Sequence, residues 1–149
     1  LVEKIKRAAN FQQGYMTLRQ ISFARLDMAY HSQDPSGITE LKAFEKEVLQ
    51  PTEVLPSQDT TRVSTSFSHI FQGGYASGYY SYKWAEVLDA DAFALFQEKG
   101  VFDAETALSF EKNILSAGGR EHPSLLFARF RGRDPQPEAL LKRSGLLTS

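Results

Sequence analysis

The sequence predicts an all-α fold, and three observations lead to this expectation. Helix-forming segments without a breaker are separated by short turns that contain Gly, Pro, Asp and Ser. Two of these segments, 11–31 and 75–99, show unlike faces when they are placed on a helical wheel. No segment shows the apolar–polar alternation of a half-buried strand. Because 149 residues, 42% of them hydrophobic, can bury a core, we expect a single helical domain over residues 1–149.

The first two helices are predicted at residues 1–9 and 11–31. Apolar side chains cover well over half of the 11–31 wheel, which is typical of a helix that is buried on several sides. Arg19 and Arg25 fall within the apolar arc. We expect them to extend to solvent or to pair with carboxylates, and a contact with a ligand is the alternative. The remaining polar strip is narrow and consists of Gln13, Thr17, Gln20, Ala24, Asp27 and His31.

A turn is predicted at residues 32–37, where Asp precedes Pro and Ser precedes Gly. The next helix is predicted at residues 39–49, with Glu40 early in it and Pro51 as its stop. Residues 51–66 contain two prolines and several Ser, Thr, Gln and Asp residues without periodicity. We therefore expect a long connection there, and such connections often carry function or move.

The second half of the chain carries four predicted helices with recognisable ends. The longest, 75–99, ends at Gly100 with a lysine in its last turn. Asp103 caps the next helix, and Pro123 and Pro137 start the two that follow. These three helices are expected at 104–115, at 123–129 or 123–130, and at 138–143.

The composition excludes several classes of partner. A net charge of −1 offers no electrostatic surface for nucleic acid or for an anionic membrane. No apolar run approaches the roughly 20 residues that span a bilayer. The absence of cysteine excludes disulfides and cysteine-bound zinc, and it fits a reducing compartment such as the cytoplasm. His31, His69 and His122 are too scattered to predict a metal site.

Alternate basic residues occur at Arg129, Arg131 and Arg133. Acidic residues flank this run at positions 121, 134 and 138. Its expected role is therefore a solvated face or pairing with carboxylates.

The stretch 67–84 holds seven aromatic residues, three glycines and one histidine, but a single formal charge. Within the predicted 75–99 helix, Tyr75, Tyr79 and Tyr82 are spaced i, i+4 and i+7 and so share one side. Their hydroxyls could donate hydrogen bonds to a carbonyl or to a developing oxyanion, because a phenol stays protonated near neutral pH. Another side of the helix is the expected core face and consists of Tyr80, Trp84, Val87, Leu88 and Leu95.

Just before this helix, Gly73 and Gly74 permit unusual backbone angles, close approach of a ligand and hinge motion. His69 lies on the loop side of the hinge, where it could donate to a substrate carbonyl or shuttle a proton. Taken singly, a tyrosine stripe, a lone histidine and a glycine pair are more often packing or turn features. Their combination within 14 residues predicts a loop and helix that contact a ligand.

The stretch 67–84, FSHIFQGGYASGYYSYKW, resembles the C-terminal region of the thimet oligopeptidase and oligopeptidase A family of zinc metallopeptidases. The resemblance continues through DADAF at 89–93, NILSAGG at 113–119 and FARFRGRDP at 127–135, and residues 11–31 are compatible with it. The oligopeptidase A branch is the most similar, and the dipeptidyl carboxypeptidases look similar here as well. The resemblance implies a mostly helical enzyme with a deep channel that cleaves short peptides.

The same resemblance implies a zinc cofactor, held by a His-Glu-x-x-His helix and a later Glu. Neither is in this sequence, so the chain is expected to be the segment C-terminal to the metal site and to be inactive alone. Its implied partners are short peptide substrates and the N-terminal remainder of the same polypeptide, in a full-length protein that is expected to be a monomer.

The resemblance also implies roles for residues of the 67–84 stretch. His69 would contact the substrate, and Gly73 and Gly74 would form a flexible loop over the active site. The tyrosines would line the cleft, and Tyr79 or Tyr82 would assist the tetrahedral intermediate that forms when zinc-activated water attacks the amide. A non-catalytic helical module that binds peptides or other partners is the alternative. A His-Glu-x-x-His motif followed by a Glu upstream would decide for the enzyme.

Overall fold

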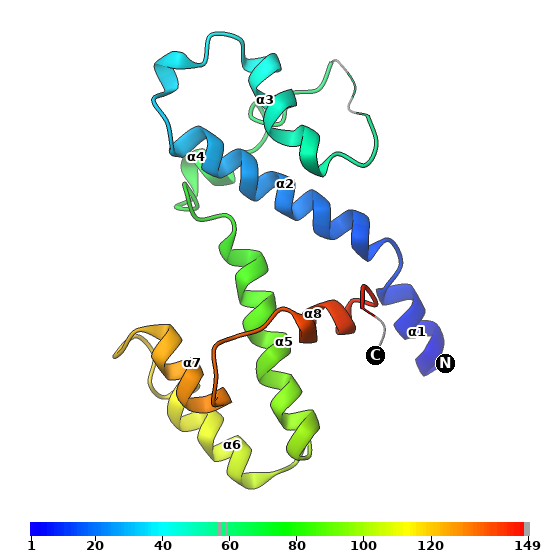
Figure 1. Cartoon of the computed structure of the whole chain (residues 1–149), viewed down its shortest axis with the longest axis vertical. Helices are drawn as coiled ribbons and strands as arrows, with labels where there is room; N and C mark the ends of the chain where they lie inside the picture. Colours follow the sequence, from blue (N-terminus) through cyan, green and yellow to red (C-terminus); the bar gives the residue numbers. More distant parts are fainter. Residues whose placement is uncertain (57, 59, 148–149) are drawn as a thin grey trace. The chain divides into compact units, whose positions relative to one another are not determined.

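The structure of the chain is a computed structural model that describes residues 1–56, 58 and 60–147. The all-α fold class is confirmed, because the described residues form helices and loops and contain no strand (Figure 1). The chain divides into two compact units, Leu1–Trp84 (unit 1) and Ala85–Ser149 (unit 2). The expectation of a single domain stays a prediction. No described helix has both the length and the apolar content that crossing a bilayer requires.

Unit 1 consists of helices joined by turns. Its elements in chain order are α1 (Val2–Ala9), α2 (Gln13–His31), η1 (Pro35–Gly37), α3 (Leu41–Leu49), η2 (Gln50–Thr52) and α4 (His69–Gln72). The longest of them, α2, packs against α3 and η2. The helices predicted at 1–9, 11–31 and 39–49 are confirmed, each starting one or two residues later than predicted.

The turns of unit 1 follow from local backbone chemistry. Gln12 adopts a left-handed conformation (φ 56°) and separates α1 from α2. The predicted turn at 32–37 contains η1, whose N-cap Asp34 accepts a hydrogen bond from the N–H of Ser36 at 2.9 Å. The connection after η2 is irregular as predicted, although positions 57 and 59 lie outside the described residues.

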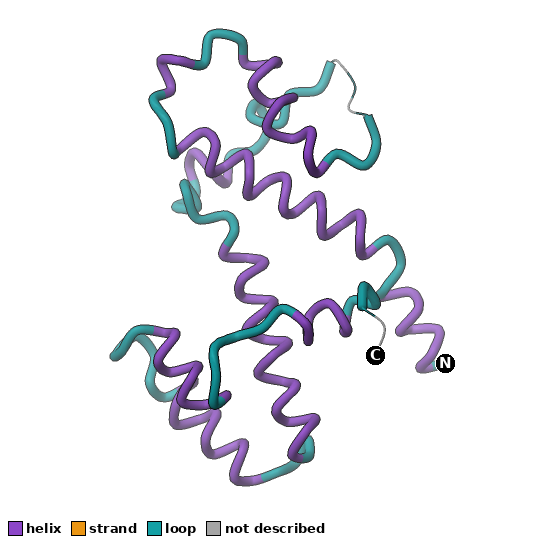
Figure 2. Tube along the Cα trace, in the orientation of Figure 1, coloured by secondary structure: helices purple, strands orange, loops and turns teal. Residues whose placement is uncertain are grey.

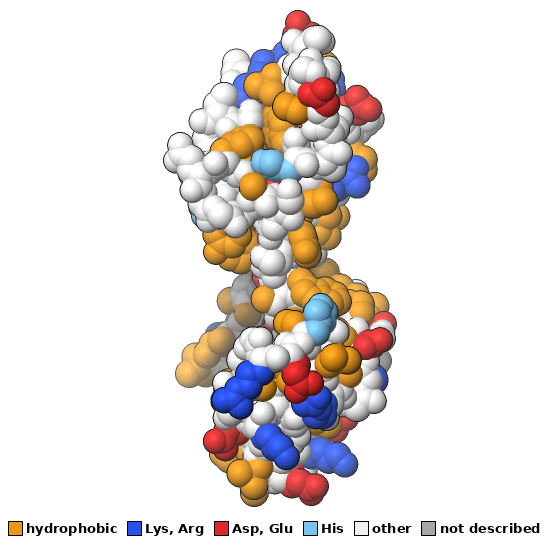
Figure 3. All heavy atoms as spheres, turned by 90° about the vertical axis from the view of Figure 1, so that its left-hand side faces the viewer, with side chains coloured by type: hydrophobic (Ala, Val, Ile, Leu, Met, Phe, Trp, Pro, Cys, Tyr) orange, Lys and Arg blue, Asp and Glu red, His pale blue; other side chains and the backbone are white. Residues whose placement is uncertain are grey.

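The predicted burial of α2 on several sides is wrong. Leu26 and Asp27 are its buried residues, whereas most of its large apolar side chains are at least one-third exposed. Hydrophobic side chains of the chain are exposed to solvent at its surface (Figure 3). The wheel reports hydrophobicity, but burial also needs a neighbouring element, and α3 covers only part of the helix within the described residues. The exposed apolar residues of α2 are Tyr15, Met16, Leu18, Ile21 and Met28.

The two arginines of α2 are exposed. The guanidinium of Arg19 lies 4.8 Å from the ring centroid of Phe23, which is a cation–π contact. Arg25 donates from Nε to the carbonyl oxygen of Val48 at 3.3 Å. Both side chains thus extend along the surface of the helix, in agreement with the first of the two expectations.

The helix predicted at 75–99 begins later, as α5 (Ser81–Lys99). Residues 73–80, here called the 73–80 loop, form turns between α4 and α5 (Figure 2). The loop contains Ser77 in a left-handed conformation (φ 58°), which no α-helix accommodates. The predicted core face is therefore only partly correct. Val87 is buried, but Tyr80 and Trp84 are about half exposed.

Unit 2 has an aromatic core. After α5, its elements are α6 (Ala104–Phe110), η3 (Glu111–Leu115), α7 (Pro123–Arg131) and α8 (Glu138–Arg143). The core consists of Ala92, Phe127 and Phe130, with Phe96 and Phe110 packed against it. The ring centroids of Phe110 and Phe130 lie 5.2 Å apart in an edge-on arrangement, which aromatic pairs favour.

The helix ends of unit 2 agree with the sequence. Asp103 caps α6 by accepting from the N–H of Thr106 at 2.8 Å, and Pro123 is the first residue of α7. Gly132 follows α7 in a left-handed conformation (φ 81°). The helix predicted at 104–115 is confirmed as α6 continued by the π-helical turn η3, in which Asn113 is buried and donates to the carbonyl oxygen of Ser109.

The basic run at the C-terminal end of α7 pairs with carboxylates, which is one of its two predicted roles. Arg129 binds Glu121 at 2.8 Å. The carboxylate of Asp91, 1% exposed, accepts from Arg131 at 3.0 Å, from Arg133 at 2.6 Å and from the N–H of Gln136 at 2.9 Å. Burial raises the pKa of Asp91, but the hydrogen bonds outweigh this effect, and its pKa is lowered overall.

Loss of the Asp91 carboxylate should destabilise the protein. Asp91→Asn removes the charged acceptor from Arg131, which is 9% exposed and keeps its pair with Glu98, and from Arg133, which is 40% exposed. Because the buried Asp91–Arg131 pair is broken, we expect a loss of about 3 kcal/mol in the free energy of unfolding at pH 7. A lowered pKa in the folded state stabilises above the unfolded pKa of about 4 and ceases to do so as the pH falls through the folded pKa. The difference between variant and wild type in thermal unfolding should therefore shrink as the pH falls below about 4 and through the lowered folded-state pKa of Asp91.

Asp89→Asn is the matched control, because Asp89 lies two residues away on α5 and pairs with Arg143 at the surface. This pair is solvent-exposed, and its loss should change the free energy of unfolding by less than about 1 kcal/mol. Equal effects of the two substitutions would contradict the role assigned to Asp91.

Candidate functional site

The 73–80 loop is attached to α2 by the carboxylate of Asp27. Oδ1 accepts from the N–H of Ser77 and Oδ2 from the N–H of Tyr79, each at 2.9 Å. Asp27 has no exposed surface, and the Nδ1 of His31 lies 2.9 Å from Oδ1. The same Nδ1 atom lies 2.8 Å from the backbone carbonyl oxygen of Asp27. Both oxygens are acceptors, so His31 can bind them only when Nδ1 carries a hydrogen.

The side chains of the candidate site form an aromatic cluster, here defined as His69, Tyr75, Tyr79 and Tyr82. The rings of Tyr75 and Tyr82 are stacked with centroids 5.0 Å apart, and those of Tyr79 and Tyr82 are 5.1 Å apart. His69, the first residue of α4, has its ring 6.1 Å from Tyr75 and 6.4 Å from Tyr79. The structure thus brings the four predicted side chains together, although Tyr75 and Tyr79 belong to the loop and not to a helix.

Two apolar rings support Tyr79 within unit 1. Phe67 lies edge-on to Tyr79 with centroids 5.0 Å apart, and Phe23 of α2 lies 6.0 Å away. Such edge-on packing adds roughly 0.5–1.5 kcal/mol per pair beyond burial. The ring of Tyr79 is therefore held from α2 as well as from the chain before α4.

The tyrosine hydroxyls are suited to donate hydrogen bonds. Burial raises the pKa of Tyr79, although the charge of Arg19 partly opposes the shift. The pKa of Tyr82 is also raised, mainly by a hydrogen bond with Tyr75 and to a smaller extent by burial. Both phenols therefore remain protonated near neutral pH. The hydroxyl of Tyr79 donates to Oε1 of Gln20 at 3.0 Å, which fixes its position relative to α2.

The two glycines before the loop have different structural needs. Gly74 adopts φ +74°, a conformation that residues with a Cβ rarely take. A Cβ at Gly73 would lie 3.3 Å from the carbonyl oxygen of His69, which is a tight contact. The predicted unusual backbone angle is therefore present at Gly74, whereas the close approach of a ligand and the hinge motion stay predictions.

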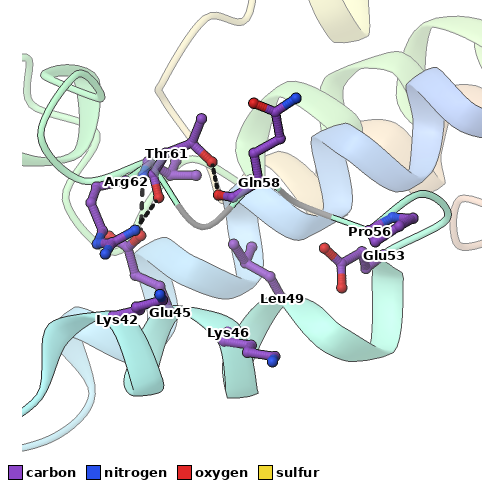
Figure 4. Close-up of a pocket in the computed structure, with 10 residues that line it drawn as sticks. Lys42, Glu45, Lys46, Leu49, Glu53, Pro56, Gln58, Thr61 and Arg62 are labelled. Carbon is purple, nitrogen blue, oxygen red and sulfur yellow. Dashed lines mark hydrogen bonds between the residues drawn. The ribbon is translucent and has the colours of Figure 1, made fainter.

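A second buried carboxylate holds the chain ahead of α4. Glu45 of α3 accepts from the N–H of Val63 at 3.1 Å, and from the N–H of Ser64 and the hydroxyl of Tyr30 at 3.0 Å each. Figure 4 shows Glu45 below the segment that carries Thr61 and Arg62, beside a pocket of about 140 Å³. Burial and the neighbouring carboxylate raise the pKa of Tyr30 to about 12.

The described residues offer no metal site. Within them, no group of three or more His, Asp or Glu side chains is placed to hold a metal ion. His31 contacts Asp27, and His122 accepts from the N–H of Ser124 at the start of α7. The zinc implied by the resemblance therefore does not fit the residues described for this chain.

Two residues of the site were not predicted, namely Asp27 and Gln20. Both fell on the narrow polar strip of the 11–31 wheel, to which the sequence analysis assigned no role. One signal could have indicated a role. The strip runs along a helix that is otherwise largely apolar, so its polar members could serve partners within the protein.

Comparison with known proteins identifies the family. The protein-family model for peptidase family M3 matches residues 1–146, and the chain therefore belongs to this family. It is 46% identical over 147 residues to oligopeptidase A of Escherichia coli (strain K12) and 44% identical over 152 residues to the probable cytosolic oligopeptidase A of Arabidopsis thaliana. Identity to the dipeptidyl carboxypeptidase of Escherichia coli (strain K12) is 34% over 148 residues.

These matches cover 98–99% of this chain but 22% of each relative, so the chain spans about a fifth of the length of the curated relatives it matches. The resemblance drawn from the 67–84 stretch is confirmed, and so is the greater similarity to oligopeptidase A than to dipeptidyl carboxypeptidase.

A methyl group at Gly74 should destabilise the 73–80 loop. Nothing lies within 4 Å of the added Cβ, so the cost of Gly74→Ala is that of the left-handed backbone, about 1–2 kcal/mol in the free energy of unfolding. Gly37→Ala is the control, because Gly37 has the same free space without a left-handed φ. Denaturant unfolding of both variants measures the difference, and equal effects would show that the backbone at Gly74 is not strained by a side chain.

Proposed function

We propose that this chain is the C-terminal, substrate-binding part of a zinc-dependent oligopeptidase that hydrolyses short peptides. The observation that carries the proposal is the aromatic cluster, because the four side chains that the family resemblance marks as substrate-contacting lie side by side. Membership of peptidase family M3 supports the same reaction class.

In this proposal the cluster binds the peptide and stabilises charge on its carbonyl oxygen. His69 and Tyr75 contact the substrate, and Gly73 and Gly74 let the backbone approach it. The hydroxyl of Tyr79 or Tyr82 donates a hydrogen bond to the oxygen of the tetrahedral intermediate. Such a donor is most effective when it is positioned before the reaction, because no reorganisation is then needed as charge develops.

The zinc ion and its ligands belong, in this proposal, to the part of the polypeptide N-terminal to this chain. The described residues provide no ligand set for it. A cytoplasmic location is supported by a relative named cytosolic, while another relative of similar identity is named organellar. The monomeric state of the full-length protein and the absence of nucleic-acid and membrane partners remain expectations from the sequence.

A non-catalytic helical module that binds peptides or other partners is the second candidate. The same aromatic cluster would serve it, and the lack of metal ligands among the described residues is compatible with it. The sequence upstream of Leu1 separates the two functions, because a His-Glu-x-x-His motif is required only by the enzyme.

Removal of a tyrosine hydroxyl tests the oxyanion role in the full-length protein. Tyr79→Phe or Tyr82→Phe should lower kcat by about 10²-fold and raise KM much less, because the lost interaction is made mainly in the transition state. Steady-state cleavage of a fluorogenic peptide gives both constants.

Tyr80→Phe serves as the matched control. Tyr80 follows Tyr79 directly, is about half exposed and is not a member of the aromatic cluster. The kcat of the Tyr80→Phe variant should therefore stay close to that of the wild type. An unchanged kcat in both cluster variants would argue against the proposed role of the hydroxyls.

The origin of the zinc gives an independent test. The 149-residue chain alone should bind no stoichiometric zinc in equilibrium dialysis and should cleave no peptide, whereas the full-length protein should do both. Zinc-dependent cleavage by the chain alone would contradict the assignment of the metal site to another part of the polypeptide.

A further inference from the structure

We propose that α2 acts as a positioning element for Tyr79, with Asp27 holding its backbone and Gln20 holding its hydroxyl. The inference rests on the proposed function, since it matters only if Tyr79 contacts the reacting carbonyl. Neither residue touches the substrate in this proposal. Both act through Tyr79.

The contacts with α2 fix Tyr79 at its two ends. Oδ2 of Asp27 accepts from the N–H of Tyr79 at 2.9 Å, and Oε1 of Gln20 accepts from its hydroxyl at 3.0 Å. Positions 20 and 27 are seven residues apart, so they lie two turns apart on the same side of the helix. A single helix thus fixes both the backbone N–H and the hydroxyl of Tyr79.

The partners suit a hydroxyl that has to act as a donor. An ionised carboxylate such as that of Asp27 accepts hydrogen bonds but donates none. It therefore binds the loop N–H groups and cannot itself donate to a substrate carbonyl. The amide of Gln20 can accept from the phenol hydrogen or donate to the phenol oxygen. Gln20 can therefore hold the oxygen of Tyr79 in place even when the hydrogen turns to a substrate carbonyl.

The backbone beside Tyr79 also needs this support. Ser77 is a non-glycine residue with φ 58°, and its N–H is bound by the other oxygen of Asp27 at 2.9 Å. Left-handed conformations of such residues persist only when surrounding contacts determine them. The carboxylate thus stabilises the turn that delivers Tyr79 to the aromatic cluster.

Glu45 provides a control of closely matched chemistry. Like Asp27, it is a buried carboxylate on a helix that accepts two backbone N–H groups and one side-chain donor. Its backbone partners are Val63 and Ser64, and no member of the aromatic cluster donates to it. A purely structural effect should therefore appear equally in variants of Asp27 and Glu45.

The experiment compares Asp27→Asn with Glu45→Gln in the full-length protein, using kcat, KM and the melting temperature. In either variant the amide NH₂ group faces a former donor, so one hydrogen bond is lost with little change in volume. Both variants should have a lower melting temperature than the wild type. Asp27→Asn should also lower kcat by about tenfold or more with KM within about threefold, because small displacements of a catalytic group reduce the rate. Glu45→Gln should retain kcat within about twofold.

The Tyr79→Phe background shows whether Asp27 acts through the hydroxyl. Once the hydroxyl is absent, Asp27→Asn should reduce kcat by less than about threefold further, since coupled residues are not additive. Gln20→Leu should show the same loss of kcat and the same dependence on Tyr79. If Asp27→Asn does not fold, Gln20→Leu, whose side chain is only partly buried, decides the question.

The outcomes separate this inference from the proposed function. Equal kcat values for Asp27→Asn and Glu45→Gln, or full additivity with Tyr79→Phe, would overturn the positioning role while leaving the peptidase intact. The same holds if Tyr82→Phe lowers kcat and Tyr79→Phe does not. If neither tyrosine variant affects kcat, the proposed function itself loses its support.

Discussion

The 73–80 loop depends on one buried carboxylate, that of Asp27. Moving an ionised carboxylate out of water costs several kcal/mol unless donors replace the lost water molecules. Here the N–H groups of Ser77 and Tyr79 and the imidazole of His31 take that place, each at 2.9 Å. The backbone of this loop is not helical, so its N–H groups also need partners from elsewhere. The charge and the loop therefore satisfy each other, and the burial of either one requires the other.

The same arrangement occurs three times in the described residues. Asp27 on α2, Glu45 on α3 and Asp91 on α5 are each buried, and each accepts a backbone N–H from a segment between helices. Unit 1 uses two of them to hold the chain on either side of α4. In unit 2, Asp91 combines one backbone N–H with two arginines. Carboxylates on helices thus hold the irregular segments against those helices, in addition to apolar packing.

This arrangement explains what the sequence could and could not predict. Helix ends depend on neighbours in the chain, so Gly100, Asp103 and Pro123 mark them directly. The burial of Asp27 depends instead on donors 50 and 52 residues away, which no local pattern contains. The wheel placed it on a narrow polar strip, and the sequence did not mark it as buried. The tyrosines were predicted to gather because of helical spacing, whereas a turn held by Asp27 gathers them.

The positions of the fixed points also limit how the glycine pair can act. Ile70 in α4 has no exposed surface, and the next fixed points along the chain are the N–H groups of Ser77 and Tyr79 on Asp27. A hinge motion at the glycine pair would therefore be confined to residues 71–76, because displacement on either side would expose Ile70 or leave the carboxylate without its donors. Tyr75 is the one member of the aromatic cluster within that segment. A hinge here would move Tyr75 against a constant arrangement of the other three side chains.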